Sequence, residues 1–284
     1  MISKKIKGAI QLFRPELPFA AGVCVILGEM IALSGFPHLR ELALGFACGF
    51  FLSGAALTLN DYFDLEVDKV NAPERPIPSG LLTASDAILL TILATLIGLA
   101  AAFLIGRLAF IIGVAFWTVG VLYNWRWKAN GLWGNLMVSS SVGITFILGG
   151  ITAGQPLNKI VWFFGLTAFL IDLAEEIAGD AMDMEGDKKR DSQSIAIRLG
   201  RETALRITTL LFLFVVLLSF VPFVFSWLGI TYLLLVSVMD VTIIFFTIRL
   251  LKSTTSRAGR SAMRGIYLGA LFGMLAFIVG QLLM

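Results

Sequence analysis

The chain has few residues of the kinds that build disulfide frameworks or zinc sites, with two cysteines and one histidine among 284 residues. Cys24 and Cys48 both fall within long apolar runs, where a thiol is typically a small buried side chain. His38 stands in a short connection without the companion ligands that a zinc site requires. We therefore expect neither a zinc site nor a disulfide framework.

Charged residues are also scarce, at 14% of the chain, whereas soluble globular domains carry about 25%. Hydrophobic residues make up 58%, and the mean hydropathy is +0.89. This apolar surface exceeds what one core can bury, so a lipid bilayer is the expected solvent. No basic segment stands apart from the apolar runs, which argues against nucleic-acid binding. The first run lacks a small-residue cleavage site, so we expect no cleavable signal peptide.

Apolar runs of about 20 residues, the length that crosses the hydrocarbon of a bilayer, occur nine times. We predict an all-α membrane protein with nine transmembrane helices in one domain over residues 1–284. The predicted spans are 17–36, 42–60, 84–105, 108–125, 133–153, 159–179, 204–226, 229–250 and 264–283.

The basic residues predict the orientation of these spans. If the N-terminus is cytoplasmic, only Arg40, Arg107 and Lys159 of the 22 Lys and Arg lie on the outer side. The predicted protein is therefore a multi-pass protein of the cell membrane with its C-terminus outside. Its two long loops, 61–83 and 180–203, are then cytoplasmic, and prolines make the second half of the first loop a rigid, non-helical cap.

Two acidic clusters share one spacing, with aspartates at i, i+3 and i+7 directly after the second and sixth apolar runs. On a helix these positions fall within an arc of roughly 60°. Carboxylate and amide oxygens are ligands of Mg²⁺, which is commonly held together with substrate phosphates. Their matched positions predict a weak internal repeat that brings both clusters above a central cavity. The candidate metal ligands are Asn60, Asp61, Asp64, Asp68, Asp180, Asp183 and Asp187.

Other charged residues lie near the ends of spans or inside them. Basic side chains close to the clusters suit phosphate groups; they are Arg14, Arg75, Lys128, Lys188, Lys189 and Arg198. Acids inside the spans usually face a cavity or a partner. Asp172, Glu175 and Glu176 extend the second cluster inward, whereas Glu29 and Asp240 are isolated and expected to be buried in pairs or hydrogen bonds.

Two other functions fit parts of this pattern. A cation transporter would use Asp172, Glu175, Glu176 and Asp240 as its ion path, but transporters usually bind ions at the bilayer midplane, and the dense clusters here lie at one membrane edge. An alcohol-phosphatidyltransferase also combines aspartates with a divalent metal. Its Asp-Gly and Ala-Arg elements do not precede either cluster.

The two clusters and their surroundings resemble the UbiA family of intramembrane prenyltransferases over nearly the whole chain. Asn60-Asp61-x-x-Asp64-x-x-x-Asp68, followed by residues 71–80, resembles the first signature of that family. Asp183-x-x-x-Asp187, continuing to Leu199-Gly200, is similar to the second. Arg14-Pro15, and Tyr123 with Lys128 and Asn135, also match segments of the family.

The resemblance implies a nine-helix bundle around a central cavity, capped by the two motif loops. Mg²⁺, as two ions, would hold an isoprenyl diphosphate whose tail lies in an apolar tunnel, and a lipophilic acceptor would capture the carbocation formed when the allylic C–O bond ionises. Carried over by position, the catalytic residues are Asp64, Asp68, Asp183, Asp187 and Tyr123. The substrate-binding residues are Arg14, Asn60, Arg75, Asn124, Lys128, Asn135, Lys188 and Arg198.

The segments 186–189 and 194–197 are most similar to archaeal members of the family that transfer a geranylgeranyl group to geranylgeranylglyceryl phosphate. Those members often carry Arg near the position of Glu175 and Lys near Gly179, and both cations are missing here. An aromatic quinone precursor of the hydroxybenzoate or naphthoate type therefore stays open as the acceptor. The sequence does not identify protein partners.

Overall fold

The computed structural model describes residues 2–188 and 192–282, and the regular structure in this part of the chain is entirely helical. By length and composition, eight of its helices are long and apolar enough to cross a membrane. This confirms the prediction of an all-α, multi-pass membrane protein. Each of these eight helices overlaps one of the nine predicted spans.

The span predicted at 159–179 lies in α8 (Lys159–Lys188). At 30 residues this helix is long enough to cross a bilayer, but it carries Asp172, Glu175 and Glu176 near its middle. Every 18-residue stretch of α8 contains these three acids, so α8 is not among the eight helices that are apolar enough by composition.

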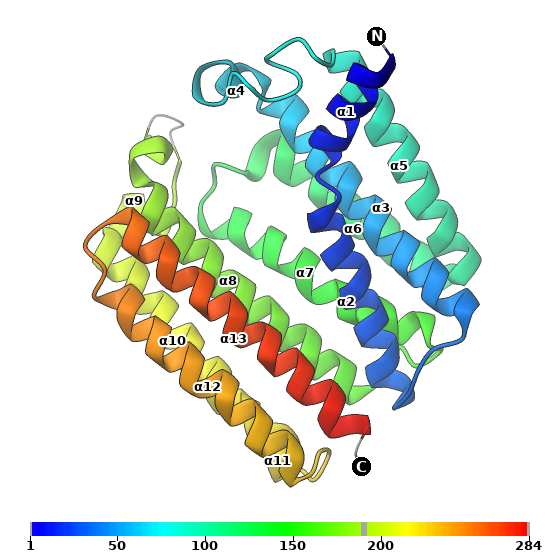
Figure 1. The fold of residues 1–284 in the computed structure, drawn as a ribbon, viewed down its shortest axis with the longest axis vertical. Coiled ribbons are helices and arrows are strands. Elements are labelled where there is room, and N and C mark those ends of the chain that lie inside the picture. The colour runs from blue at the N-terminus through cyan, green and yellow to red at the C-terminus, as the bar shows by residue number, and fades with distance from the viewer. Residues whose placement is uncertain (1, 189–191, 283–284) are drawn as a thin grey trace. The chain divides into compact units, whose positions relative to one another are not determined.

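The chain forms two compact units, of which the first comprises residues 1–126 with 145–158. Within it α3 packs against both α2 and α5 (Figure 1). Gly49 permits this approach, because a Cβ there would lie 2.9 Å from the backbone oxygen of Ala21. The helices of this unit are α1 (Ile2–Phe13), α2 (Glu16–Leu33), α3 (Leu39–Phe63), α4 (Leu65–Asn71), α5 (Ala84–Ile105), α6 (Arg107–Leu122) and the π-helix η1 (Tyr123–Trp127), which ends one residue beyond it.

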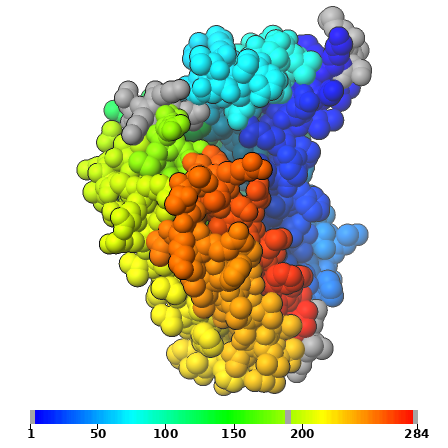
Figure 2. Space-filling view, turned by 60° about the vertical axis from the view of Figure 1, so that its left-hand side comes forward, coloured from blue at the N-terminus to red at the C-terminus, as the bar shows by residue number. Residues whose placement is uncertain are grey.

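The segment between α4 and α5 has the predicted non-helical character. Turns follow one another from residue 72 to the capping box at Thr83, and Ile77 and Leu82 are buried against Leu12 and Ala87. In the space-filling view of Figure 2, this cyan segment stands as a compact projection at one end of the unit. The buried leucine and isoleucine fix the segment to α1 and α5 without regular secondary structure.

The second unit comprises residues 127–144 and 159–284, so α7 (Leu132–Thr152) begins in it and ends in the first. Within it α8 packs against α10 and α13, and α12 packs against α10 and α13 (Figure 1). α9 ends at Leu199, and Gly200 follows with φ 89°, a backbone conformation that glycine adopts without strain. Its other helices are α9 (Ile195–Leu199), α10 (Arg201–Ser219), α11 (Val221–Val224), α12 (Ile230–Leu251) and α13 (Ser256–Leu282).

Candidate functional site

The first acidic cluster lies where α3 meets α4, at one end of the first unit. Asp61 belongs to the last turn of α3, Asp68 belongs to α4, and Asp64 between them is not helical, with φ −82° and ψ 0°. The helical path from α3 into α4 is therefore interrupted at this single residue, and Asp68 itself is helical. The N–H groups of Asp64 and Asp68 still donate to the carbonyls of Asn60 and Asp64, at 2.9 and 2.8 Å. These bonds keep the acidic side chains in one row across the junction.

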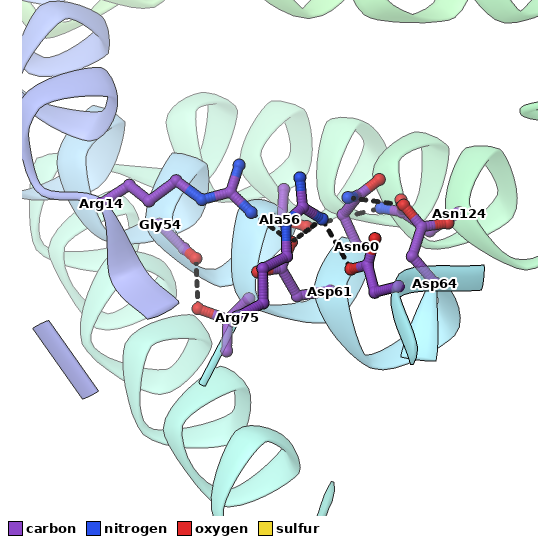
Figure 3. A network of polar contacts seen from close by, with 10 residues as sticks. Arg14, Gly54, Ala56, Asn60, Asp61, Asp64, Arg75 and Asn124 are labelled. Carbon is purple, nitrogen blue, oxygen red and sulfur yellow. Dashed lines mark hydrogen bonds and ion pairs between the residues drawn. The ribbon is translucent and has the colours of Figure 1, made fainter. Parts of the chain in front are cut away.

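Two arginines converge on the buried aspartates of this row (Figure 3). Asp61 and Asp68 are each only 3% exposed. Arg14, which joins α1 to α2 with φ 47°, forms an ion pair with Asp61. Arg75 lies 2.6 Å from an oxygen of Asp68 and 3.6 Å from one of Asp61. Buried carboxylates are costly unless they are paired, and these two arginines supply the pairing.

Arg75 is held in its charged form by this arrangement. Burial disfavours the charge on its guanidinium, but the hydrogen bond to Asp68 and the negative charges of Asp61, Asp68 and Asp64 outweigh burial and raise the pKa of Arg75. Arg75 therefore places a fixed positive charge beside three carboxylates.

Two asparagines complete the polar network of the first unit (Figure 3). The amide of Asn60 donates to Asp64 at 3.2 Å. The buried amide of Asn124 donates to the carbonyls of Gly120, at 3.0 Å, and Ala56, at 3.5 Å, so it connects η1 with α6 and α3. Tyr123 and Asn124 are the first two residues of η1, and π-helical turns of this kind are frequent at functional sites.

The second acidic cluster lies on α8 in the second unit. Asp180 accepts a hydrogen bond of 2.9 Å from Asn135, and Asp183 forms an ion pair with Arg260 of α13. Sequence reasoning missed Arg260, although the run of basic residues between the last two predicted spans places it on the same predicted side. Asp187 is the next member of the row, and its side chain lies outside the described residues.

The other predicted basic residues are spread along the second unit. Lys128 follows η1, is half-buried, and carries its charge within electrostatic reach of Glu176. Arg198 is exposed near the end of α9. The side chain of Lys188 and the whole of Lys189 lie outside the described residues.

The donor atoms of both clusters suit a hard divalent cation. In the part of the chain that the structure describes, no three Asp, Glu, His or Cys side chains are gathered as a set of metal ligands. Arginine holds Asp61, Asp68 and Asp183, while asparagine donates to Asp64 and Asp180. Carboxylate and amide oxygens are what Mg²⁺ prefers, so the chemistry of the residues fits this ion.

The two isolated acids inside the spans differ from one another. Asp240 accepts a hydrogen bond of 2.9 Å from Ser219, as predicted. Glu29 is fully buried, and neither oxygen of its carboxyl group has a hydrogen-bond partner among the described residues, so the prediction is wrong for Glu29. Gly45 of α3 and Gly149 of α7 lie directly against Glu29, and neither glycine has a side chain that could donate to the carboxyl group.

Comparison with known proteins matches this chain to one family. The profile of the UbiA prenyltransferase family matches residues 21–279. A relative from Methanopyrus kandleri, named digeranylgeranylglyceryl phosphate synthase, is 34% identical over 277 residues that cover 98% of this chain and 100% of the relative. A solved structure of digeranylgeranylglyceryl phosphate synthase in membranes is 29% identical, with a TM-score of 0.84 over 99% of both chains. A UbiA homologue from Archaeoglobus fulgidus bound to GPP and Mg²⁺ has a TM-score of 0.66 over 95% of this chain and 99% of that one; at 19% identity it is similar in fold.

Proposed function

Because this chain belongs to the UbiA prenyltransferase family, we propose that it transfers a geranylgeranyl group from geranylgeranyl diphosphate to geranylgeranylglyceryl phosphate. Relatives named digeranylgeranylglyceryl phosphate synthase match it at about 30% identity over nearly their full length, which supports this acceptor. Family membership makes the chain a prenyltransferase and decides against the cation transporter and the phosphatidyltransferase.

The observation that carries the proposal is the row of buried aspartates held by Arg14 and Arg75. Asp61 and Asp68 are nearly inaccessible, yet each contacts a guanidinium that is itself only partly buried. Arginine forks match phosphate oxygens as well as carboxylates, so the same two side chains can bind a diphosphate. An alternation of fixed carboxylates and cations at the end of a span is what a Mg²⁺–diphosphate group requires.

We assign the roles by cluster. Asn60, Asp61, Asp64 and Asp68 would hold Mg²⁺ in the first cluster, and Asp180, Asp183 and Asp187 would do so in the second. When bound, Mg²⁺, as two ions, neutralises charge on the departing diphosphate. The remaining residues bind the diphosphate or stabilise its charge; they are Arg14, Arg75, Tyr123, Asn124, Lys128, Asn135, Lys188 and Arg198.

The membrane arrangement follows the distribution of basic residues. We propose that α8 crosses the bilayer together with the eight apolar helices, which gives nine spans in one domain over residues 1–284. The N-terminus and both acidic clusters then lie on the cytoplasmic side, and the C-terminus lies outside. The central cavity and the cap formed by the two motif loops stay predictions.

The test uses purified protein in detergent with Mg²⁺ and labelled geranylgeranyl diphosphate. We expect a labelled ether with geranylgeranylglyceryl phosphate and no labelled product with 4-hydroxybenzoate. A labelled product with 4-hydroxybenzoate alone would establish the quinone-precursor alternative. Asp64→Ala and Asp183→Ala should each abolish product while the protein keeps its helical circular-dichroism spectrum. Glu202→Gln, which changes an exposed acid on α10, is the matched control. Near wild-type turnover in both aspartate variants would refute the assignment.

A further inference from the structure

A second group of polar side chains lies deeper along α8 than Asp180, within the second unit. It consists of Asp172, Glu175 and Glu176 from α8, Ser139 from α7 and Tyr267 from α13, and we name it the polar shelf. Ser139 donates to Asp172 at 2.8 Å, and the hydroxyl of Tyr267 is hydrogen-bonded to Glu175. α8 packs against α13 along this stretch (Figure 1). Three helices therefore direct polar groups to one place within the second unit.

Glu175 is the residue of the shelf that the fold leaves incomplete. It is 4% exposed, and its Oε1 has no hydrogen-bond partner in the part of the chain that the structure describes. Leaving a buried acceptor without a donor costs about 1–3 kcal/mol, and more for a charged group. Such an atom therefore requires an explanation, and a ligand that brings a donor to Oε1 is one.

The charges of the shelf select the kind of donor. The side chains of Asp172 and Glu176 lie within electrostatic reach of Glu175, and Lys128 lies within reach of Glu176. Three neighbouring acids repel an anionic group and favour a neutral O–H at Oε1, so any phosphate on the same ligand must point away from the shelf. Tyr267 is half exposed, so the edge of the shelf at α13 is reachable from outside the unit.

We propose that the polar shelf binds the hydroxyl group of the acceptor and that Glu175 takes its proton during prenyl transfer. This inference rests on the proposed function. Glu175 lies five residues from Asp180, which is about 7.5 Å along the axis of α8. The two positions also differ by about 140° around that axis, so the prenyl diphosphate must reach from Asp180 towards the face of α8 that carries Glu175. Tyr267 is a positioning residue, because its hydroxyl fixes the carboxyl group of Glu175 and leaves Oε1 directed at the acceptor.

The step balances without any further reactant. The allylic C–O bond of the prenyl diphosphate breaks, and its electron pair leaves with the diphosphate. A lone pair of the acceptor hydroxyl forms the new C–O bond to that carbon. The hydroxyl proton passes to Oε1 of Glu175, so the products are an ether and diphosphate. A positioned base of this kind contributes about 10²–10⁴-fold to a reaction rate.

The test compares Glu175→Gln and Tyr267→Phe with Glu202→Gln in purified protein with Mg²⁺. Glu175→Gln should lower ether formation at least about 100-fold, and Tyr267→Phe about 10-fold, while binding of geranylgeranyl diphosphate changes less than twofold. A second experiment measures binding. It compares the affinity of the protein for geranylgeranylglyceryl phosphate with its affinity for an analogue that carries a methyl ether in place of the hydroxyl. Wild type should prefer the hydroxyl compound at least tenfold, and Glu175→Gln should lose that preference.

The outcomes separate this inference from the proposed function. Ether formation by Glu175→Gln within threefold of wild type would overturn the role of Glu175, and so would loss of diphosphate binding in that variant. If wild type forms no ether with geranylgeranylglyceryl phosphate, the proposed function fails. In that case the hydroxyl preference of wild type and of Glu175→Gln still tests whether the polar shelf binds a hydroxyl group, because that preference is measured by binding and not by turnover.

Discussion

Removing Arg75 tests how the first acidic cluster is held together. In Arg75→Ala, Asp61 keeps its ion pair with Arg14, but Asp68, whose side chain is 4% exposed beside Arg75, loses a 2.6 Å bond. Breaking a buried ion pair by removing one partner costs about 3–5 kcal/mol. The side chain of Arg75 is 36% exposed, so water screens part of this interaction and we expect about 2 kcal/mol.

A double-mutant cycle measures whether the unpaired charge causes that loss. Asp68→Asn in the Arg75→Ala background removes the charge, so it should restore at least about 1 kcal/mol of the free energy of unfolding. The free energy is measured by denaturant titration in mixed micelles, followed by circular dichroism. Both variants should also lose prenyl transfer, because each removes a proposed diphosphate or metal contact.

Additivity of the two substitutions within about 0.5 kcal/mol would refute the pairing of Arg75 with Asp68. Arg206→Ala is the matched control. It breaks the exposed Arg206–Glu202 pair, whose side chains are 71% and 78% exposed, and should cost less than about 0.5 kcal/mol.

Three further predictions follow from the site and the packing. Chelation of divalent cations by EDTA should abolish transfer and added Mg²⁺ should restore it; turnover that persists in EDTA would contradict the proposed metal chemistry. Gly28→Ala should lower thermal stability, because a Cβ there meets the backbone carbonyl of Phe146, whereas Gly179→Ala, where the nearest atom is 4.0 Å away, should leave it equal or raise it by up to about 1 kcal/mol. Thr83→Ala removes the capping box at the start of α5 and should cost about 1 kcal/mol in unfolding experiments; no loss would show that the cap is dispensable.

Local patterns in the sequence predicted the helices well because each depends on neighbouring residues. Eight apolar runs became membrane-length helices, and the prolines after Asp68 ended regular structure where expected. The glycine after Leu199 ended α9 through a positive φ that other residues adopt only with strain. In the same way, the row from Asp180 to Asp183 lies on one helix, as its spacing indicates.

Only the tertiary structure identified the partners of the acids. Arg14 is 47 residues from Asp61, and Arg260 is 77 residues from Asp183. The sequence placed these arginines on the predicted cytoplasmic side but could not pair them with particular carboxylates, because such a pairing depends on how helices pack. The same holds for Glu29, which is buried without a hydrogen-bond partner among the described residues.

By itself, the sequence determined the membrane-spanning helices, the prenyltransferase family and the two acidic rows, since periodicity and spacing are properties of short segments. Helix packing decided which side chains meet. It divided the first row at Asp64, gave Asp61 and Asp68 their arginines, and left one oxygen of Glu175 without a described partner. These features arise from contacts between helices far apart in the chain, and no local pattern specifies them.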